Sequence, residues 1–180
     1  RARLFVRADR KGAFNNPQFY KRYERMIRDV DPALVEKTAK DLAGLLGKED
    51  VEAIRDLATI ADLAILSLGT ENLAEFFLRE LGLREEFFLI KGKRIRRKKG
   101  KAYLKVNIGE AEDKRTHLES LRKSYGKIVA IGDGPTDIPM LEAADLGLLL
   151  IWGARSSPLP FELHSSLPSA CDRAKGFLIS

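Results

Sequence analysis

The apolar residues of this chain fall into two kinds of segment, short continuous runs and longer stretches with helical spacing. Short runs bounded by Gly, Asp or Lys are typical of buried β-strands, whereas apolar positions three and four residues apart indicate amphipathic helices. The two kinds alternate along the chain, which predicts an α/β fold. The expected strands are residues 3–8, 62–68, 87–90 and 102–108, with two more inside the segment 127–150.

Three amphipathic helices are expected between residues 15 and 60. Asp31 and Pro32 have the residue types of an N-cap and a first helical position, so they begin the second helix, which Gly47 is expected to end. The third helix covers residues 49–60, and an ordinary crossover helix is the simplest interpretation of it. Further helices are expected at 71–81, closed by Gly82, and at 110–125.

The segment between Lys91 and Lys105 has a different character from the rest of the chain. Residues 91–101, with the sequence KGKRIRRKKGK, contain no acidic residue and lie between the strands expected at 87–90 and 102–108. The two Lys-Gly-Lys triplets, centred on Gly92 and Gly100, are turn signals, so the basic run is expected at the tip of a β-hairpin. Two interpretations stay open, a solvated tip or an electrostatic site for a phosphate-rich partner such as nucleic acid. Aromatic residues are scarce in this run, which argues against base stacking.

Composition narrows the class of protein. The chain has 180 residues with 44% apolar residues, enough for one domain with a modest insertion, and no run is long enough to span a membrane. The single cysteine, Cys171, excludes an internal disulfide and a thiolate metal cluster, which favours a cytoplasmic setting. A net charge of +6 and a pI near 9.5 favour an anionic partner.

The segment 127–150 carries the strongest chemical signal. A buried strand is followed by a turn that is rich in Gly and contains Asp133 and Asp137, and then by a short helix and a second buried strand. Two carboxylates at the carboxyl end of a strand suit a hard cation such as Mg²⁺, and this is the edge where open α/β sheets bind ligands. The alternative is a tight turn in which the aspartates serve as helix caps.

The sequence GDGPTDIPML in this turn resembles the fourth motif of the haloacid dehalogenase-type hydrolases, especially their phosphoserine phosphatase-like branch. The resemblance implies a Rossmann-like parallel sheet, a small helical cap and phosphoryl transfer through an aspartyl-phosphate. It assigns residues 1–13 and 61–180 to the core and 14–60 to the cap. The basic β-hairpin is an addition to that plan.

The resemblance also implies a nucleophilic aspartate after the first strand, and Asp9 is the residue that matches. Lys11 stands where the family has a second aspartate, the general acid and base, and Ala13 stands where it has threonine. Lysine is a poor proton donor near neutral pH, so turnover is expected to be slow. A register shifted by two residues would put Arg7 at the nucleophile position and leave no nucleophile, but only the first register matches Gly12.

The remaining motifs are found in the expected order. Ser67 and Gly69 follow the second strand and match the second motif, which binds phosphate oxygens. Lys114 matches the third-motif lysine, with Arg115 as its neighbour and alternative. The resemblance implies Mg²⁺ held by Asp9, Asp133, Asp137 and the backbone carbonyl of Lys11, with Lys114 and Ser67 binding the phosphoryl group.

Two functions are therefore expected as alternatives. The first is Mg²⁺-dependent hydrolysis of a small phosphomonoester, with Asp9, Lys11 and Lys114 as catalytic residues. The second is a catalytically impaired relative that binds a phosphate-rich ligand or nucleic acid through the basic hairpin.

Overall fold

The computed structural model describes residues 25–26, 30–151 and 160–180. The strand expected at 3–8, the first helix of the 15–60 segment and the candidate residues Asp9 and Lys11 lie outside the described residues. The expected division into a core and a cap at 14–60 therefore stays a prediction.

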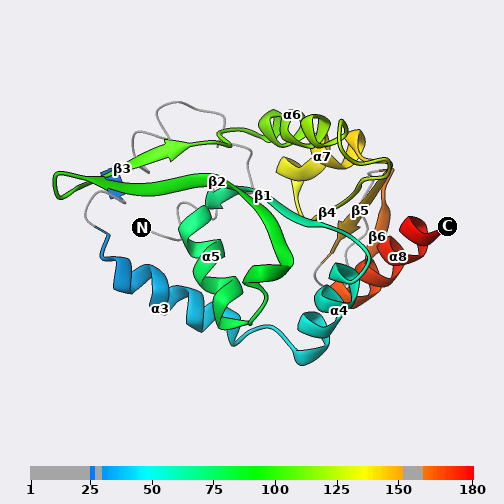
Figure 1. Cartoon of the computed structure of the whole chain (residues 1–180), viewed down its shortest axis with the longest axis horizontal. Helices are drawn as coiled ribbons and strands as arrows, with labels where there is room; N and C mark the ends of the chain where they lie inside the picture. The colour runs from blue at the N-terminus through cyan, green and yellow to red at the C-terminus, as the bar shows by residue number, and fades with distance from the viewer. Residues whose placement is uncertain (1–24, 27–29, 152–159) are drawn as a thin grey trace.

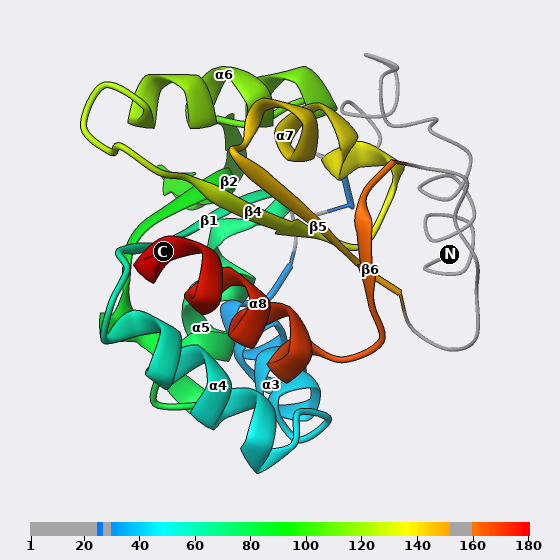
Figure 2. The same cartoon turned by 90° about the vertical axis from the view of Figure 1, so that its right-hand side faces the viewer.

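The described chain is a mixed α/β fold in which strands form the central layer (Figure 1), as predicted. Helices cover both faces: α6 and α7 lie above the strands in Figure 2, and α4, α5 and α8 lie below them. The helices are α3 (Pro32–Ala43), α4 (Lys48–Ala58), α5 (Glu71–Glu80), α6 (Ala111–Leu121), α7 (Ile138–Ala143) and α8 (Leu167–Ile179), with single 3-10 turns η2 (Arg84–Glu86) and η3 (Pro135–Asp137). The strands are β1 (Leu63–Thr70), β2 (Phe87–Lys98), β3 (Lys101–Val106), β4 (Val129–Gly132), β5 (Leu146–Leu150) and β6 (Glu162–His164).

The strands form two groups of three. In the first, β1 pairs with β2 in parallel and β2 pairs with β3 antiparallel. In the second, β4, β5 and β6 are all parallel. Among the described residues, β1 and β4 each have a hydrogen-bonded neighbour on one side only.

Strand β5 is the centre of the core because it is buried on both faces. Leu148 packs into a cluster below the strands, with Leu57 of α4 and the small residues of α8, and Leu149 packs into a cluster above them, with α6 and α7. This explains the unbroken apolar run at the end of β5, since a strand covered on both faces has no solvent side on which to place polar residues. A third cluster joins α5 to β2.

The helices begin where the sequence predicts but end earlier. Asp31 is the N-cap of α3, and its carboxylate accepts a hydrogen bond from the N–H of Ala33 at 3.0 Å, as expected. The prediction that Gly47 ends this helix is wrong, because α3 ends at Ala43 with Gly44 as its C-cap, and Gly47 is instead the N-cap of α4. Glycine is accepted at both kinds of cap, so the residue type alone did not decide between them.

The β-hairpin differs from the expectation in one important respect. The triplet centred on Gly92 is not a turn, because β2 continues through it to Lys98 and pairs with β3 over its whole second half. The only turn lies at Lys99 and Gly100, whose φ angles of 48° and 77° are those of a two-residue hairpin loop. The basic run is therefore mostly paired strand, and the expected long basic tip is wrong.

The C-terminal part contains elements that the sequence pattern did not reveal. β6 adds a third parallel strand beside β5, and α8 packs against α4 and the lower side of β5. Strand β6 is short and has no alternating pattern, which explains why it escaped prediction. Within the described residues, no helix has the length and apolar character needed to cross a bilayer.

Candidate functional site

The turn after β4 is held together by the buried carboxylate of Asp137. Its Oδ2 accepts hydrogen bonds from the backbone N–H groups of Asp133 at 3.0 Å and Gly134 at 3.1 Å. Its Oδ1 accepts a hydrogen bond from Nζ of Lys114 at 2.5 Å. Charge-assisted bonds of this kind are short and strong, so they fix the backbone of the turn and the position of Lys114 together.

Lys114 occupies an energetically unfavourable position. It lies in the first turn of α6, where the helix dipole disfavours a cation, and its side chain is buried. A buried charge is tolerated only when a partner and hydrogen bonds compensate for its lost hydration, and Asp137 is that partner. The structure therefore brings together two of the predicted site residues that lie in different motifs.

Gly132 is required for this arrangement. A Cβ atom at this position would lie 2.4 Å from the Cβ of Asp137, which is closer than any real contact, so a larger residue would displace the anchoring carboxylate. The side chain of Asp133, the first aspartate of the motif, is exposed at the end of β4. The two aspartates of the turn thus differ, because the carboxylate of Asp137 is buried and anchored whereas Asp133 is exposed.

The Ser67 motif forms a bulge at the carboxyl end of β1. Pairing with β2 is interrupted between Leu66 and Thr70, so the three residues between them face a single position, Gly92. A Cβ at Gly92 would lie 2.7 Å from the carbonyl oxygen of Gly69 and 2.9 Å from that of Ser67. The glycine that the sequence suggested as a turn signal instead allows two backbones to approach closely. Within the bulge, the Ser67 hydroxyl accepts a hydrogen bond from the N–H of Gly69 at 3.0 Å.

A buried polar network that the sequence pattern did not indicate supports the bulge. Glu71, the first residue of α5, accepts hydrogen bonds from the N–H of Gly92 at 3.0 Å, from Nδ2 of Asn107 at 2.6 Å and from Nε of Arg94 at 2.5 Å. Burial alone would raise the pKa of Glu71, but the hydrogen bonds from Asn107, Arg94 and Gly92 outweigh it and hold the pKa below its ordinary value. A glycine between lysines inside a strand was the one sequence signal for a close backbone approach here.

Lys93 adds a second buried cation to this region. Its side chain is almost completely buried, and Nζ donates a hydrogen bond to the carbonyl oxygen of Leu68, the middle residue of the bulge. Both the backbone and the electrostatic environment of the Ser67 bulge are therefore set by β2, through Gly92 and Lys93.

The segment that enters α6 joins the two halves of the site. The N–H groups of Asn107 and Ile108 both donate to the carbonyl oxygen of Gly92, at 2.9 Å and 3.2 Å. A few residues later, Lys114 reaches Asp137. Because this connection is short, the Ser67 bulge and the Asp133 turn lie at the same end of the strand layer, as a site at the carboxyl ends of parallel strands requires.

The described residues contain no group of three or more acidic, histidine or cysteine side chains that could hold a metal ion. Asp133 contributes an oxygen donor of the type that Mg²⁺ prefers. Asp137 also has oxygen donors, but its three hydrogen bonds are those of an anchor for the turn. Asp9 and the carbonyl of Lys11, which were predicted to complete the ligands, lie outside the described residues.

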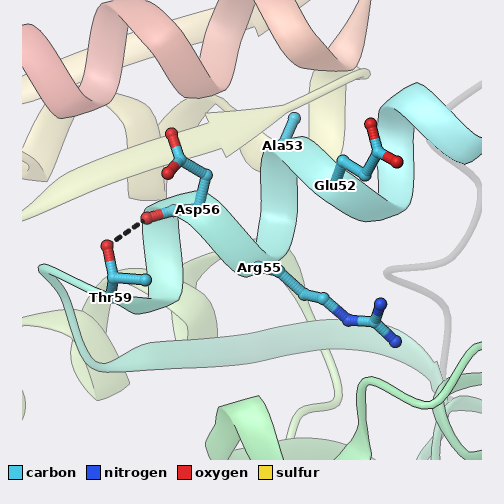
Figure 3. A pocket seen from close by; sticks show the side chains of 5 residues that line it. All are labelled: Glu52, Ala53, Arg55, Asp56 and Thr59. Carbon is cyan, nitrogen blue, oxygen red and sulfur yellow. Dashed lines mark hydrogen bonds between the residues drawn. The ribbon is translucent and has the colours of Figure 1, made fainter.

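One depression in the described part of the chain lies away from the strand ends (Figure 3). It is lined by one stretch of α4, where Thr59 donates to the carbonyl of Asp56 at 2.7 Å and Arg55 extends away toward the end of α5. Most of these residues are exposed, Arg55 donates to the carbonyl oxygens of Leu81 and Gly82, and Asp56 pairs with Lys175. We therefore assign the candidate site to the strand ends and not to this depression.

Comparison with known proteins identifies the family of this chain. The sequence model of a family described as haloacid dehalogenase-like hydrolases matches residues 10–145, which is most of the chain. The match includes Ser67, Lys114, Asp133 and Asp137, and it starts one residue after Asp9. A search of curated proteins returned no match. Because the match extends over β1 to β4 and includes both Lys114 and Asp137, this chain belongs to the haloacid dehalogenase-like hydrolases.

Proposed function

We propose that the protein is a Mg²⁺-dependent phosphomonoester hydrolase of the phosphoserine phosphatase-like branch, acting through a phosphorylated Asp9. The observation that carries the proposal is the buried contact between Lys114 and Asp137 beside the exposed carboxylate of Asp133. A buried cation at a helix N-terminus costs stability, and such a cost is explained when the cation stabilises the charge of a phosphoryl group.

The strand arrangement supports a shared site for Ser67 and Asp133. Leu63 and Leu66 of β1 pack against the same two clusters that contain β5, so the β1 edge without a described partner faces the β4–β5 pair. This arrangement brings the carboxyl ends of β1 and β4, which carry Ser67 and Asp133, toward each other, and we propose that Asp9 acts together with these two residues.

In the proposed reaction, a carboxylate oxygen of Asp9 attacks phosphorus and the bond from phosphorus to the ester oxygen breaks. The leaving alkoxide takes a proton from solvent water, and a water molecule then hydrolyses the aspartyl-phosphate, which releases inorganic phosphate and restores the Asp9 carboxylate. Ser67, the N–H groups of its bulge and Lys114 bind the phosphoryl oxygens, so positioning and electrostatics supply most of the catalysis.

The donor set is compatible with Mg²⁺. Asp133 and Asp9 would supply carboxylate oxygens and Lys11 a backbone carbonyl, with Asp137 as the further predicted ligand, and water would complete the coordination. Bound Mg²⁺ would offset the negative charge of the phosphoryl group. The anchoring contacts of Asp137 support a positioning role for it in any case.

Lys11 in place of the second aspartate implies slow breakdown of the intermediate. A lysine amine near neutral pH is protonated and cannot act as the general base that activates water. We therefore expect a burst of product equal to the enzyme concentration, followed by slow turnover, with phosphorylated protein detectable by mass spectrometry.

The test is hydrolysis of p-nitrophenyl phosphate and a panel of phosphorylated metabolites with Mg²⁺. Asp9→Asn removes the nucleophile and should abolish the burst, and Asp133→Asn should reduce activity and weaken its Mg²⁺ dependence. Asp172→Asn is the matched control, because it makes the same chemical change at an exposed carboxylate of α8. Activity that is absent in the parent protein, or unchanged in Asp9→Asn, would contradict the proposal.

A further inference from the structure

The register of the hairpin collects its cations on one face. Residues that oppose each other in an antiparallel pair point to the same side, and residues two apart along a strand do so as well. Three opposed pairs therefore share one face of the hairpin: Arg94 with Lys105, Arg96 with Tyr103, and Lys98 with Lys101. We call the exposed part of this surface the basic face; it consists of Arg96, Lys98, Lys101, Tyr103 and Lys105.

Unlike Arg94 and Arg97, the four cations of the basic face are not held by ion pairs or hydrogen bonds to other described residues. Arg94 forms ion pairs with Glu71 and Glu75, and Arg97 on the opposite side donates to the carbonyl of Val30 at 2.8 Å. By contrast, no ion pair or hydrogen bond joins a side chain of the four cations of the basic face to another described residue. Their charge is therefore available for a partner.

The opposite face of the hairpin is less accessible. Ala102 is only 6% exposed, and Ile95 and Leu104 are partly buried, whereas Tyr103 is 39% exposed. The middle of the opposite face is thus apolar and covered, whereas Arg97 and Val106 on that face are exposed. Because β2 and β3 are paired along this length, the four cations form a fixed row and not a mobile tip. Alternate residues on a strand lie about 6.6 to 6.8 Å apart, which gives the row a regular spacing.

We propose that the basic face binds single-stranded nucleic acid, through its phosphate backbone and with one base against Tyr103. A linear array of four cations that form no ion pair with another described residue suits a linear polyanion, since the nearby Glu71 and Glu75 are already paired with Arg94. An exposed tyrosine among the cations supplies a stacking surface that every base can use. The sequence argued against stacking because aromatics are scarce in the basic run, but the register brings Tyr103 opposite Arg96 from the other strand. This site is separate from the proposed phosphatase reaction.

The test is fluorescence anisotropy with a labelled oligonucleotide that lacks terminal phosphates, measured in EDTA. Under these conditions the proposed phosphatase site has neither a phosphomonoester to bind nor Mg²⁺, so binding there cannot be mistaken for binding to the basic face. The variant Arg96→Gln, Lys98→Gln, Lys101→Gln, Lys105→Gln should weaken binding at least tenfold. The control replaces four exposed lysines elsewhere on the molecule: Lys37→Gln, Lys40→Gln, Lys48→Gln, Lys123→Gln. It lowers the net charge by the same four units, from +6 to +2. This control should retain most of the affinity.

Further measurements sharpen the expectation. Four phosphate contacts on a single strand predict a slope of log affinity against log salt no steeper than about −2.8. Tyr103→Leu should weaken single-strand binding several-fold and change duplex binding little. A further measurement uses the parent protein alone, so it does not require any variant to fold. In it, bound oligonucleotide should protect Lys98, Lys101 and Lys105 from chemical acetylation.

Three outcomes would overturn the proposal. The first is an absence of binding at low salt together with unprotected lysines. The second is an equal loss of affinity in the face variant and the charge-matched control, which would mean that net charge alone attracts the oligonucleotide. The third is tighter binding to anionic lipid vesicles than to the oligonucleotide, which would assign the face to a membrane surface.

Discussion

At the scale of single residues, the site depends on the way three donors converge on one carboxylate. Asp137 receives Nζ of Lys114 on one oxygen and two backbone N–H groups on the other. An amide of the same shape offers only one acceptor oxygen and turns an NH₂ group toward a donor. The Lys114 charge would also stay buried without a compensating anion.

Asp137→Asn is therefore expected to destabilise the protein by about 3–5 kcal/mol, the usual cost of removing one partner from a buried pair. Urea unfolding measures the change. The exposed pair of Lys175 and Asp56 is the control, because Asp56→Asn should cost less than about 1 kcal/mol in solvent. Equal losses in the two variants would mean that the Lys114–Asp137 pair is no more than a surface ion pair.

At the scale of elements, the long strand β2 organises one half of the site. Its first part pairs with β1 and its second part with β3, and the change of partner occurs near Gly92. The Glu71 network holds α5, β2 and the segment after β3 together at this point. The position of Ser67 is thus a property of three elements and not of its own strand.

This network should give stability a defined pH dependence. Because the pKa of Glu71 in the folded protein lies below the ordinary value of 4.5, its contribution is complete above pH 4.5 and is lost as pH falls through the lower folded value. Glu71→Gln should therefore be less stable than the parent protein by about 1–3 kcal/mol at neutral pH, with a difference that shrinks in acid. Urea unfolding over a pH series tests this.

The control for Glu71 is Glu80→Gln, a change at an exposed glutamate of the same helix. It should have little effect at any pH. A difference between Glu71→Gln and the parent protein that stays constant from neutral to acidic pH would show that the carboxylate charge of Glu71 is not what stabilises the network.

At the scale of the whole molecule, β5 couples the two helical layers. Leu148 is completely buried beneath the strands against α4 and α8, and its neighbour Leu149 is buried on the other side. Leu148→Ala should cost about 2–5 kcal/mol, because the cavity can collapse only partly, and unfolding should remain one cooperative transition.

Leu163→Ala on the adjacent strand β6 is the matched control, since Leu163 is 37% exposed and its truncation leaves no closed cavity. Thermal unfolding followed by far-UV circular dichroism compares the two variants. Similar melting temperatures for both would indicate that the layer beneath β5 is not a close-packed core.

The local parts of the fold were predictable because they rest on local physics. Apolar runs predicted β1, β3, β4, β5 and the first part of β2, helical spacing predicted α3 to α6, and Asp31 predicted the start of α3. The turn after β4 was also recognisable, since Gly and Asp at those positions have few other uses. Helix ends were less accurate, because glycine serves both as a C-cap and as an N-cap, as Gly44 and Gly47 show.

By itself, the sequence determined the fold class, the order of the motifs and the segments that carry Ser67, Lys114 and Asp133. Only the tertiary structure decided that Gly92 is a point of close backbone approach, that Glu71 and Lys93 are buried beside Ser67, and that the hairpin cations share one face. The reason is physical. Residue types and spacing report local conformational preference, whereas burial and strand register depend on which distant segment lies opposite.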